Sequence, residues 1–134
     1  MIDRRPVHSS ITEQHVDALV ETFYSAVWAD ERLGPIFEAH IVDRAAHLAT
    51  MKRFWSSVLL RSGGYKGKPL PAHVKLSGVV ESDFPRWLEH FHHATRSVFE
   101  PEAADLVDAA AKNIAESLWL AMFGGVATGR PSWR

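Results

Sequence analysis

The chain contains no cysteine. Disulfide bonds, thiolate zinc sites and iron–sulfur clusters all depend on cysteine, so these three classes are excluded. The chain also lacks any run of about 18 apolar residues, the length that a membrane-spanning helix needs. Residues 1–6 do not form the apolar stretch of a signal peptide. We therefore expect a cytoplasmic protein with no membrane partner.

The chain also has no large excess of basic or of acidic residues. Fifteen basic side chains stand against 16 acidic ones, and the isoelectric point is about 6.7. Proteins that bind nucleic acids gather Lys and Arg into a patch or along a helix, and no stretch of this sequence does so. We therefore expect no nucleic-acid partner.

The length indicates one domain. A chain of 134 residues, 46% of them hydrophobic, is long enough for one core and too short for two. We expect a single domain over residues 1–134, with its core at about residues 10–125 and a loose C-terminal tail. Eight histidines and five tryptophans are many for this length. Histidine is the commonest nitrogen ligand of metals and tryptophan offers a flat apolar surface, so both suit a flat, iron-bearing ligand.

Apolar residues recur at steps of three and four in four stretches, which predicts four amphipathic helices. The first begins at Ser10, where Ser-Ile-Thr-Glu has the form of a capping box, and its stop signal is Gly34–Pro35. The second covers about residues 43–61. The third begins between Ser82 and Pro85, and the fourth opens at Glu100–Pro101.

The connections between these helices are short or irregular. Ile36–Phe37 is predicted to lie in a connection, and Leu106 on the buried face of the last helix. Three glycines and two prolines within residues 62–71 forbid a long helix there, and residues 72–76 are predicted to form one or two helical turns. No stretch alternates with a period of two. The prediction is therefore an all-α fold.

His73 is the first candidate for chemistry. One interpretation is a surface histidine on a loop, and the other is an axial iron ligand. An iron ligand needs a neutral imidazole whose second nitrogen donates to a fixed acceptor, and a backbone carbonyl of Pro69 or Leu70 could accept that bond.

Three further side chains also have two interpretations each. Taken singly, Tyr24 is a core-edge tyrosine, His47 a partly buried core histidine and Trp87 a packing residue. Together with His73 they supply a metal ligand, two hydrogen-bond donors and a second imidazole in one all-α domain.

The order and spacing of several segments resemble the truncated haemoglobin family. The segments are Phe23–Tyr24, Leu33–Phe37, His47 followed by Phe54–Trp55, residues 54–69 followed by His73, Phe84–Leu88 and Ala115–Leu118. The stretch from Phe54 to His73 is similar to the third group of that family in particular. The resemblance covers roughly residues 12–123.

This resemblance implies a globin-like two-over-two helical sandwich around haem b. His73 matches the proximal iron ligand, and Tyr24, His47 and Trp87 match residues on the distal side, where gases bind. His47, at the rim of the pocket, could also act as a gate for ligand entry. The remaining candidates for contact with the haem are Phe37, Met51, Phe54, Trp55, Tyr65, Leu76, Ile114 and Leu118.

The function that the resemblance implies is reversible binding of a diatomic gas, chiefly O₂, at ferrous iron, as in oxygen binding or transport. CO and NO are expected as further ligands. One alternative is a haem enzyme for nitric-oxide dioxygenation or a peroxidase-like reaction, which needs an external reductase because the chain has no flavin or nicotinamide module. Another is a haem-free helical bundle with a regulatory role.

Overall fold

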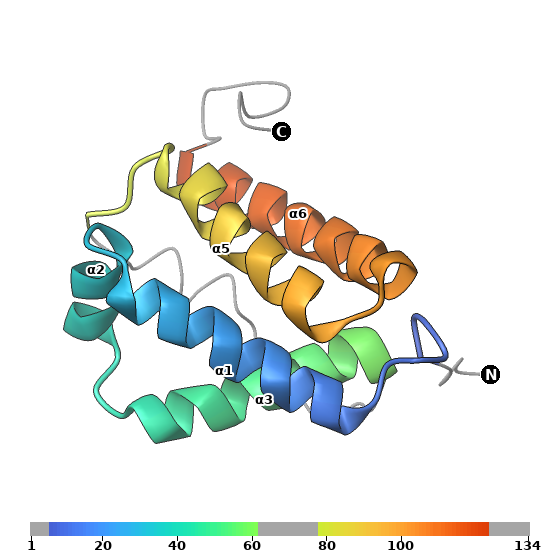
Figure 1. The fold of residues 1–134 in the computed structure, drawn as a ribbon. Helices are drawn as coiled ribbons and strands as arrows, with labels where there is room; N and C mark the ends of the chain where they lie inside the picture. Colours follow the sequence, from blue (N-terminus) through green and yellow to red (C-terminus); the bar gives the residue numbers. More distant parts are fainter. Residues whose placement is uncertain (1–5, 62–77, 124–134) are drawn as a thin grey trace.

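The computed structural model describes residues 6–61 and 78–123, and within them it confirms the all-α prediction. These residues form helices and no strand. The helices, shown in Figure 1, are α1 (Glu13–Ala29), α2 (Leu33–His40), α3 (Arg44–Leu60), α5 (Asp83–Val98) and α6 (Pro101–Phe123).

The four long helices form two layers. Helix α1 packs against α3 on one side and against α5 on the other, and α5 packs against α6. One layer is therefore the pair α1 and α3, and the other is the pair α5 and α6, as Figure 1 shows. This is the two-over-two sandwich that the resemblance to truncated haemoglobins implies. The largest fully buried side chains at the junction of the layers are Phe23 and Leu19 of α1, Leu59 of α3 and Phe91 of α5.

The first helix begins two residues later than its expected N-cap. Thr12, not Ser10, caps α1: its hydroxyl accepts from the backbone N–H of His15 at 3.3 Å, and His15 Nδ1 accepts from the Thr12 N–H at 3.1 Å. The imidazole therefore takes the part that Glu or Gln plays in the usual capping box. The backbone N–H of Ser10 instead donates to His8 Nδ1 at 3.1 Å.

Helix α2 corrects the prediction that Ile36–Phe37 lies in a connection. Both residues are helical, and Gly34–Pro35 stands in the first turn of α2, where proline is tolerated. Gly34 also lies against the end of α1. A Cβ atom at this position would come within 2.5 Å of the backbone oxygen of Trp28. Glycine is therefore required by the close approach of two backbones.

The other helix starts agree with the sequence. Asp43 caps α3 and accepts from the Ala46 N–H at 3.1 Å, α5 begins at Asp83, and α6 begins at Pro101. The prediction that Leu106 lies on the buried face of the last helix is wrong, because 39% of its surface is exposed. Helix α6 packs mainly against α5, so its apolar face is wider than the area that α5 covers.

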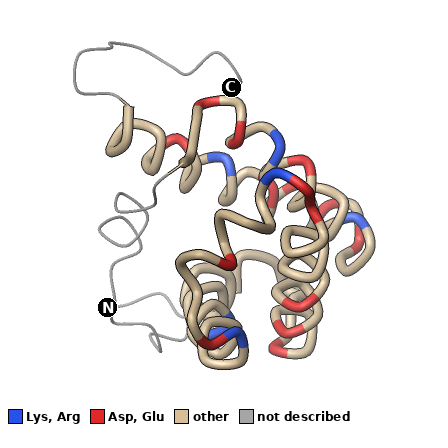
Figure 2. The backbone as a smooth tube through the Cα atoms, turned by 90° about the vertical axis from the view of Figure 1, so that its left-hand side faces the viewer, with Lys and Arg blue, Asp and Glu red and all other residues tan. Residues whose placement is uncertain are grey.

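The surface agrees with the balanced composition. Figure 2 shows basic and acidic residues interspersed along the helices, without a continuous basic stripe on the part of the backbone that is described. In that same part, no helix is both long and apolar enough to cross a bilayer.

Candidate functional site

An apolar pocket lies between α2, α5 and α6. Its lining includes Phe37 from α2, Phe84 and Trp87 from α5, and Leu118 and Met122 from α6. The structure thus brings three sequence-predicted residues, Phe37, Trp87 and Leu118, around one space. Asp83 is the charged residue in this lining. Phe84 and Met122 were missed, although each lies one helical turn from a predicted residue on the same face.

Tyr24 and His47 meet beside this pocket, at the interface of α1 and α3. Their rings lie 5.0 Å apart in an edge-to-face arrangement, and the Tyr24 ring lies 6.1 Å from that of Phe37. Tyr24 is 4% exposed. Its hydroxyl makes no hydrogen bond to another residue of the described ranges, and burial raises its pKa far above the ordinary value. The hydroxyl therefore stays protonated and able to donate.

Trp87 approaches the same region from α5. Its ring packs edge-on against Phe23 at 5.2 Å and stacks on Phe91 at 5.7 Å. Phe23 also contacts Tyr24, with ring centroids 4.9 Å apart. Within the described ranges, the Trp87 indole N–H makes no hydrogen bond. The rings that carry the two donors, Tyr24 and Trp87, thus both contact Phe23.

Trp28 is a neighbour of this group that the sequence did not single out. Its ring lies 5.5 Å from that of Tyr24 and 6.4 Å from that of His47, and the Arg44 guanidinium lies 4.6 Å from its centre. Arg44 in turn pairs with Glu38. The signal was present, because Trp28 follows Tyr24 by four residues and so lies on the same face of α1. Trp28 and Arg44 line, together with Tyr24, a second hollow beside α1 and α3.

The remaining predicted haem contacts lie in the core, at its edge, or outside the described residues. Met51 and Trp55 of α3 are buried, and the Trp55 ring lies 4.9 Å from that of Phe91. Phe54 and Ile114 are partly buried against the same core. These four do not line the pocket between α2, α5 and α6. His73, Tyr65 and Leu76 lie outside the described residues.

Two nearly buried carboxylates connect the end of α1 with α5. Asp30 follows α1, and its side chain is 4% exposed; that of Asp83, the first residue of α5, is 6% exposed. Burial acts to raise the pKa of Asp30, but hydrogen bonds from Arg86, His90 and two backbone N–H groups outweigh it and hold the pKa well below its usual range. Asp30 is therefore ionised at neutral pH.

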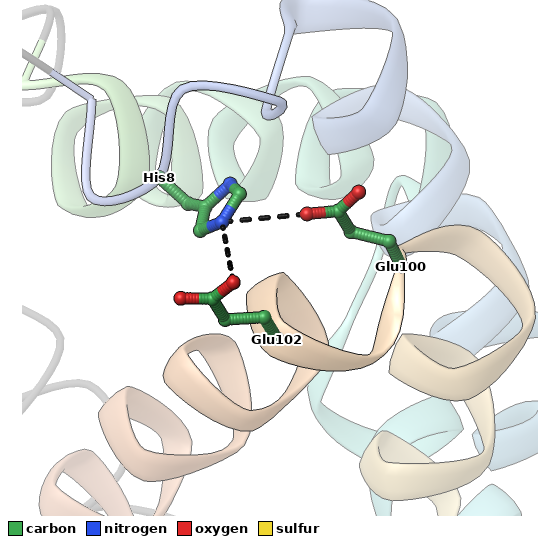
Figure 3. A group of neighbouring side chains, drawn as sticks. All are labelled: His8, Glu100 and Glu102. Atoms are coloured by element: carbon green, nitrogen blue, oxygen red, sulfur yellow. Dashed lines mark ion pairs between the residues drawn. The ribbon is translucent and has the colours of Figure 1, made fainter.

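A group of possible metal ligands lies at the other end of the molecule. Figure 3 shows His8 Nε2 directed at Glu100 and Glu102, at 3.3 and 3.6 Å from their carboxylate oxygens. His8 Nδ1 accepts the N–H of Ser10, so the neutral ring carries its proton on Nε2. A metal ion needs the Nε2 lone pair, which that proton occupies. The group is therefore a set of close contacts between an imidazole and two carboxylates, which hold the N-terminal segment against the start of α6.

Comparison with known proteins decides the family. The group 3 truncated hemoglobin ctb of Campylobacter jejuni is 32% identical to this chain over 110 residues, which are 79% of the chain and 87% of that relative. The chain belongs to the group III truncated haemoglobins. The crystal structure of the group III truncated hemoglobin from C. jejuni matches this one with a TM-score of 0.82 at 28% identity, over 92% of this chain and 98% of that chain. No family model matches the sequence.

Membership makes this truncated haemoglobin a globin-type haem-binding protein. The described residues fit such a group. The pocket between α2, α5 and α6 has apolar and aromatic walls, the kind of surface that packs against a flat apolar macrocycle. The Tyr24 side chain, 4% exposed and next to Phe37, keeps a protonated hydroxyl, which suits a polar ligand held next to that macrocycle.

Proposed function

We propose that this truncated haemoglobin binds haem b through His73 and reversibly binds O₂, with Tyr24 and Trp87 as the hydrogen-bond donors to the ligand. The haem supplies the ferrous iron at which diatomic gases bind. The observation that carries the proposal is the Tyr24 hydroxyl. The Tyr24 side chain is 4% exposed, its ring lies 6.1 Å from that of Phe37, and burial keeps its hydroxyl protonated. It can therefore donate to a ligand held beside Phe37.

The two donors distinguish one gas from another. O₂ in such a complex carries partial negative charge on its outer atom, whereas CO carries much less. Each donor hydrogen bond is worth about 1 kcal/mol, which corresponds to a factor of about five in a dissociation rate. The low dielectric of the pocket strengthens both bonds. Tyr24 and Trp87 therefore slow the release of O₂ more than that of CO.

The other predicted residues supply the walls. We propose that Phe37 and Leu118, which line the pocket, pack on the macrocycle and exclude water from it. Met51, Phe54, Trp55 and Ile114 complete the apolar surroundings. Tyr65 and Leu76 are proposed as contacts on the proximal side with His73, and His47 is proposed as the residue that controls access to Tyr24.

Dissociation rates of O₂ and CO from Tyr24→Phe and Trp87→Phe test the donor roles. We expect each substitution to speed O₂ release about fivefold and to change CO release much less. Trp119→Phe is the matched control, because this buried indole donates to Glu81 at 2.5 Å and belongs to the cluster of Phe84 and Leu118. We expect it to leave the ratio of the O₂ and CO rates unchanged. Equal effects of Tyr24→Phe on both gases contradict the donor role.

Sustained turnover distinguishes the enzymatic alternative from reversible gas binding. Nitric-oxide dioxygenation consumes one electron from a reductase in each cycle, because the oxidised haem must be returned to the ferrous state. Stopped-flow mixing of the oxygenated protein with NO measures the first cycle, and a cellular reductase added afterwards measures the following ones. Stoichiometric oxidation without sustained turnover supports reversible binding, and sustained turnover supports the enzyme.

A further inference from the structure

We propose that Asp30 is a positioning residue for Trp87: it fixes helix α5 against the end of α1 and thereby sets where the Trp87 indole stands. The consequence for O₂ release rests on the proposed function, in which that indole donates to the ligand. The positioning itself is a property of this chain's own side chains.

Asp30 is surrounded by donors from two segments. Arg86 Nε lies 2.9 and 2.7 Å from its two carboxylate oxygens, and His90 Nε2 lies 2.6 Å from one of them. The backbone N–H groups of Arg32 and Leu33 donate to it at 2.7 and 2.9 Å. The carboxylate therefore joins the first turn of α2 to two consecutive turns of α5.

A second carboxylate makes the connection in the opposite direction. Asp83 of α5 accepts from Arg32 through Nε and Nη2, both at 3.0 Å, and from the backbone N–H of Val80 at 2.8 Å. Arg32 Nη2 also donates to the Gly78 carbonyl at 2.5 Å. Two acid–base pairs therefore join segment 30–32 to the first half of α5. Segment 30–32 supplies the acid of one pair, Asp30, and the base of the other, Arg32. Each nearly buried carboxylate takes several directed hydrogen bonds, from a half-exposed guanidinium and from backbone N–H groups, so the two segments have little freedom to shift.

Trp87 lies inside this connection. Arg86 precedes it and His90 follows it by three residues, so the two donors to Asp30 bracket it within about one turn of α5. Its ring is held by apolar contacts with Phe23 of α1 and Phe91 of α5, with no hydrogen bond to the described residues. Apolar contacts are not directional. The place of the indole N–H therefore follows from where α5 lies on α1.

A purely structural role for Asp30 is the competing explanation, and the chain offers a matched control for it. Asp108 of α6 has a side chain that is 13% exposed, and it binds the C-terminal half of the same helix α5. It accepts from Thr95 at 2.7 Å, from Arg96 at 3.0 Å and pairs with His92 at 2.9 Å. Thr95 lies two turns beyond Trp87. Loss of Asp108 therefore weakens α5 without touching the turn that carries the indole.

The test compares Asp30→Asn with Asp108→Asn in the CO complex of the holoprotein. The readout is the ¹⁵N-indole NMR signal of Trp87, assigned by its disappearance in Trp87→Phe, together with the unfolding midpoint. We expect both variants to lower the midpoint, and only Asp30→Asn to shift the Trp87 signal. Arg86→Gln, at a half-exposed position, is the second variant should Asp30→Asn fail to fold. We expect it to shift the same signal. An unmoved Trp87 signal in Asp30→Asn, or in Arg86→Gln where Asp30→Asn does not fold, overturns the proposal.

The dissociation rate of O₂ connects positioning with function. We expect Asp30→Asn to speed O₂ release by up to about fivefold, and to have no such effect in the Trp87→Phe background. The same acceleration in both backgrounds overturns the assignment to Trp87. If Trp87→Phe alone leaves O₂ release unchanged, the donor role in the proposed function fails, while the indole signal still decides whether Asp30 positions the ring.

Discussion

Gly34→Ala sets two effects of opposite sign against each other. Alanine at an interior helical position is ordinarily more favourable than glycine by about 1 kcal/mol, because it loses less backbone freedom on folding. At Gly34 the added Cβ atom would lie 2.5 Å from the backbone oxygen of Trp28 and 3.3 Å from its carbonyl carbon. The first distance is short of ordinary van der Waals contact by roughly 1 Å. Both neighbours are backbone atoms, so no side chain can rotate away.

We expect the steric cost of the added Cβ atom to exceed the gain in helix propensity. Overpacking inside a well-packed region costs about 1–3 kcal/mol and sometimes more, and here relief requires α2 to move away from α1. That movement also strains the hydrogen bond from the Gly34 N–H to the Asp30 carbonyl, which is 2.8 Å long. We expect a net loss of about 1–2 kcal/mol in the free energy of unfolding. For a domain of this size the midpoint falls by roughly 4 °C per kcal/mol.

Thermal and urea unfolding of the holoprotein measure the effect, and haem transfer to apomyoglobin measures whether the pocket changes. Ile36 and Phe37 move with α2, so we expect faster haem loss as well. Pro35→Ala, an exposed change in the same turn, is the control and should cost less than about 1 kcal/mol. A stabilised Gly34→Ala variant, with the gain of an ordinary helical site, would refute the close approach of α1 and α2.

Two further predictions follow from the site. His73→Gly is expected to lose haem or to hold it only with added imidazole, and an unchanged Soret spectrum contradicts the proximal assignment. Tyr24→Phe is expected to make the free energy of unfolding fall less steeply as the pH rises above about 10. Burial raises the pKa of Tyr24 in the folded state above its value in the unfolded state. The contribution of the protonated hydroxyl to stability is therefore complete below about pH 10 and is lost above it. In urea unfolding of the ferric protein, the wild type is expected to lose up to about 1.4 kcal/mol more per pH unit than Tyr24→Phe, and equal slopes contradict the buried, protonated hydroxyl.

The long helices were predictable because their signals are local. Asp43, Pro101 and the apolar period mark their starts and faces within a few residues. The start at Ser10 was wrong because the sequence does not show that the His15 imidazole completes a cap at Thr12. Helix α2 was missed because Gly34–Pro35 is ambiguous: it ends helices, but a proline also fits the first turn of a new one.

The site was predictable only in part, and for a physical reason. Tyr24, His47, Phe37 and Trp87 were predicted from their order along the chain; the structure brings Tyr24 next to His47 and Phe37, and Phe37 and Trp87 line one pocket, while their roles toward a ligand stay predictions. Asp30, four residues before the Gly34–Pro35 stop signal, was not among the candidates. Its partners Arg86 and His90 follow 56 and 60 residues later, and no local pattern reports a charge pair over that distance.

The short turn between α5 and α6 has a consequence for how the molecule assembles. Only Phe99 and Glu100 separate the two helices, and Thr95, which is fully buried, donates to Asp108 across the pair. Closing so small a loop costs little chain entropy, and the contacts it forms are near in sequence, which is the condition for fast folding. The layer that carries Trp87 is therefore a helical hairpin able to form early. The α1 and α3 layer joins it through the contact of α1 with α5, between residues distant in sequence, so we expect that contact to form later.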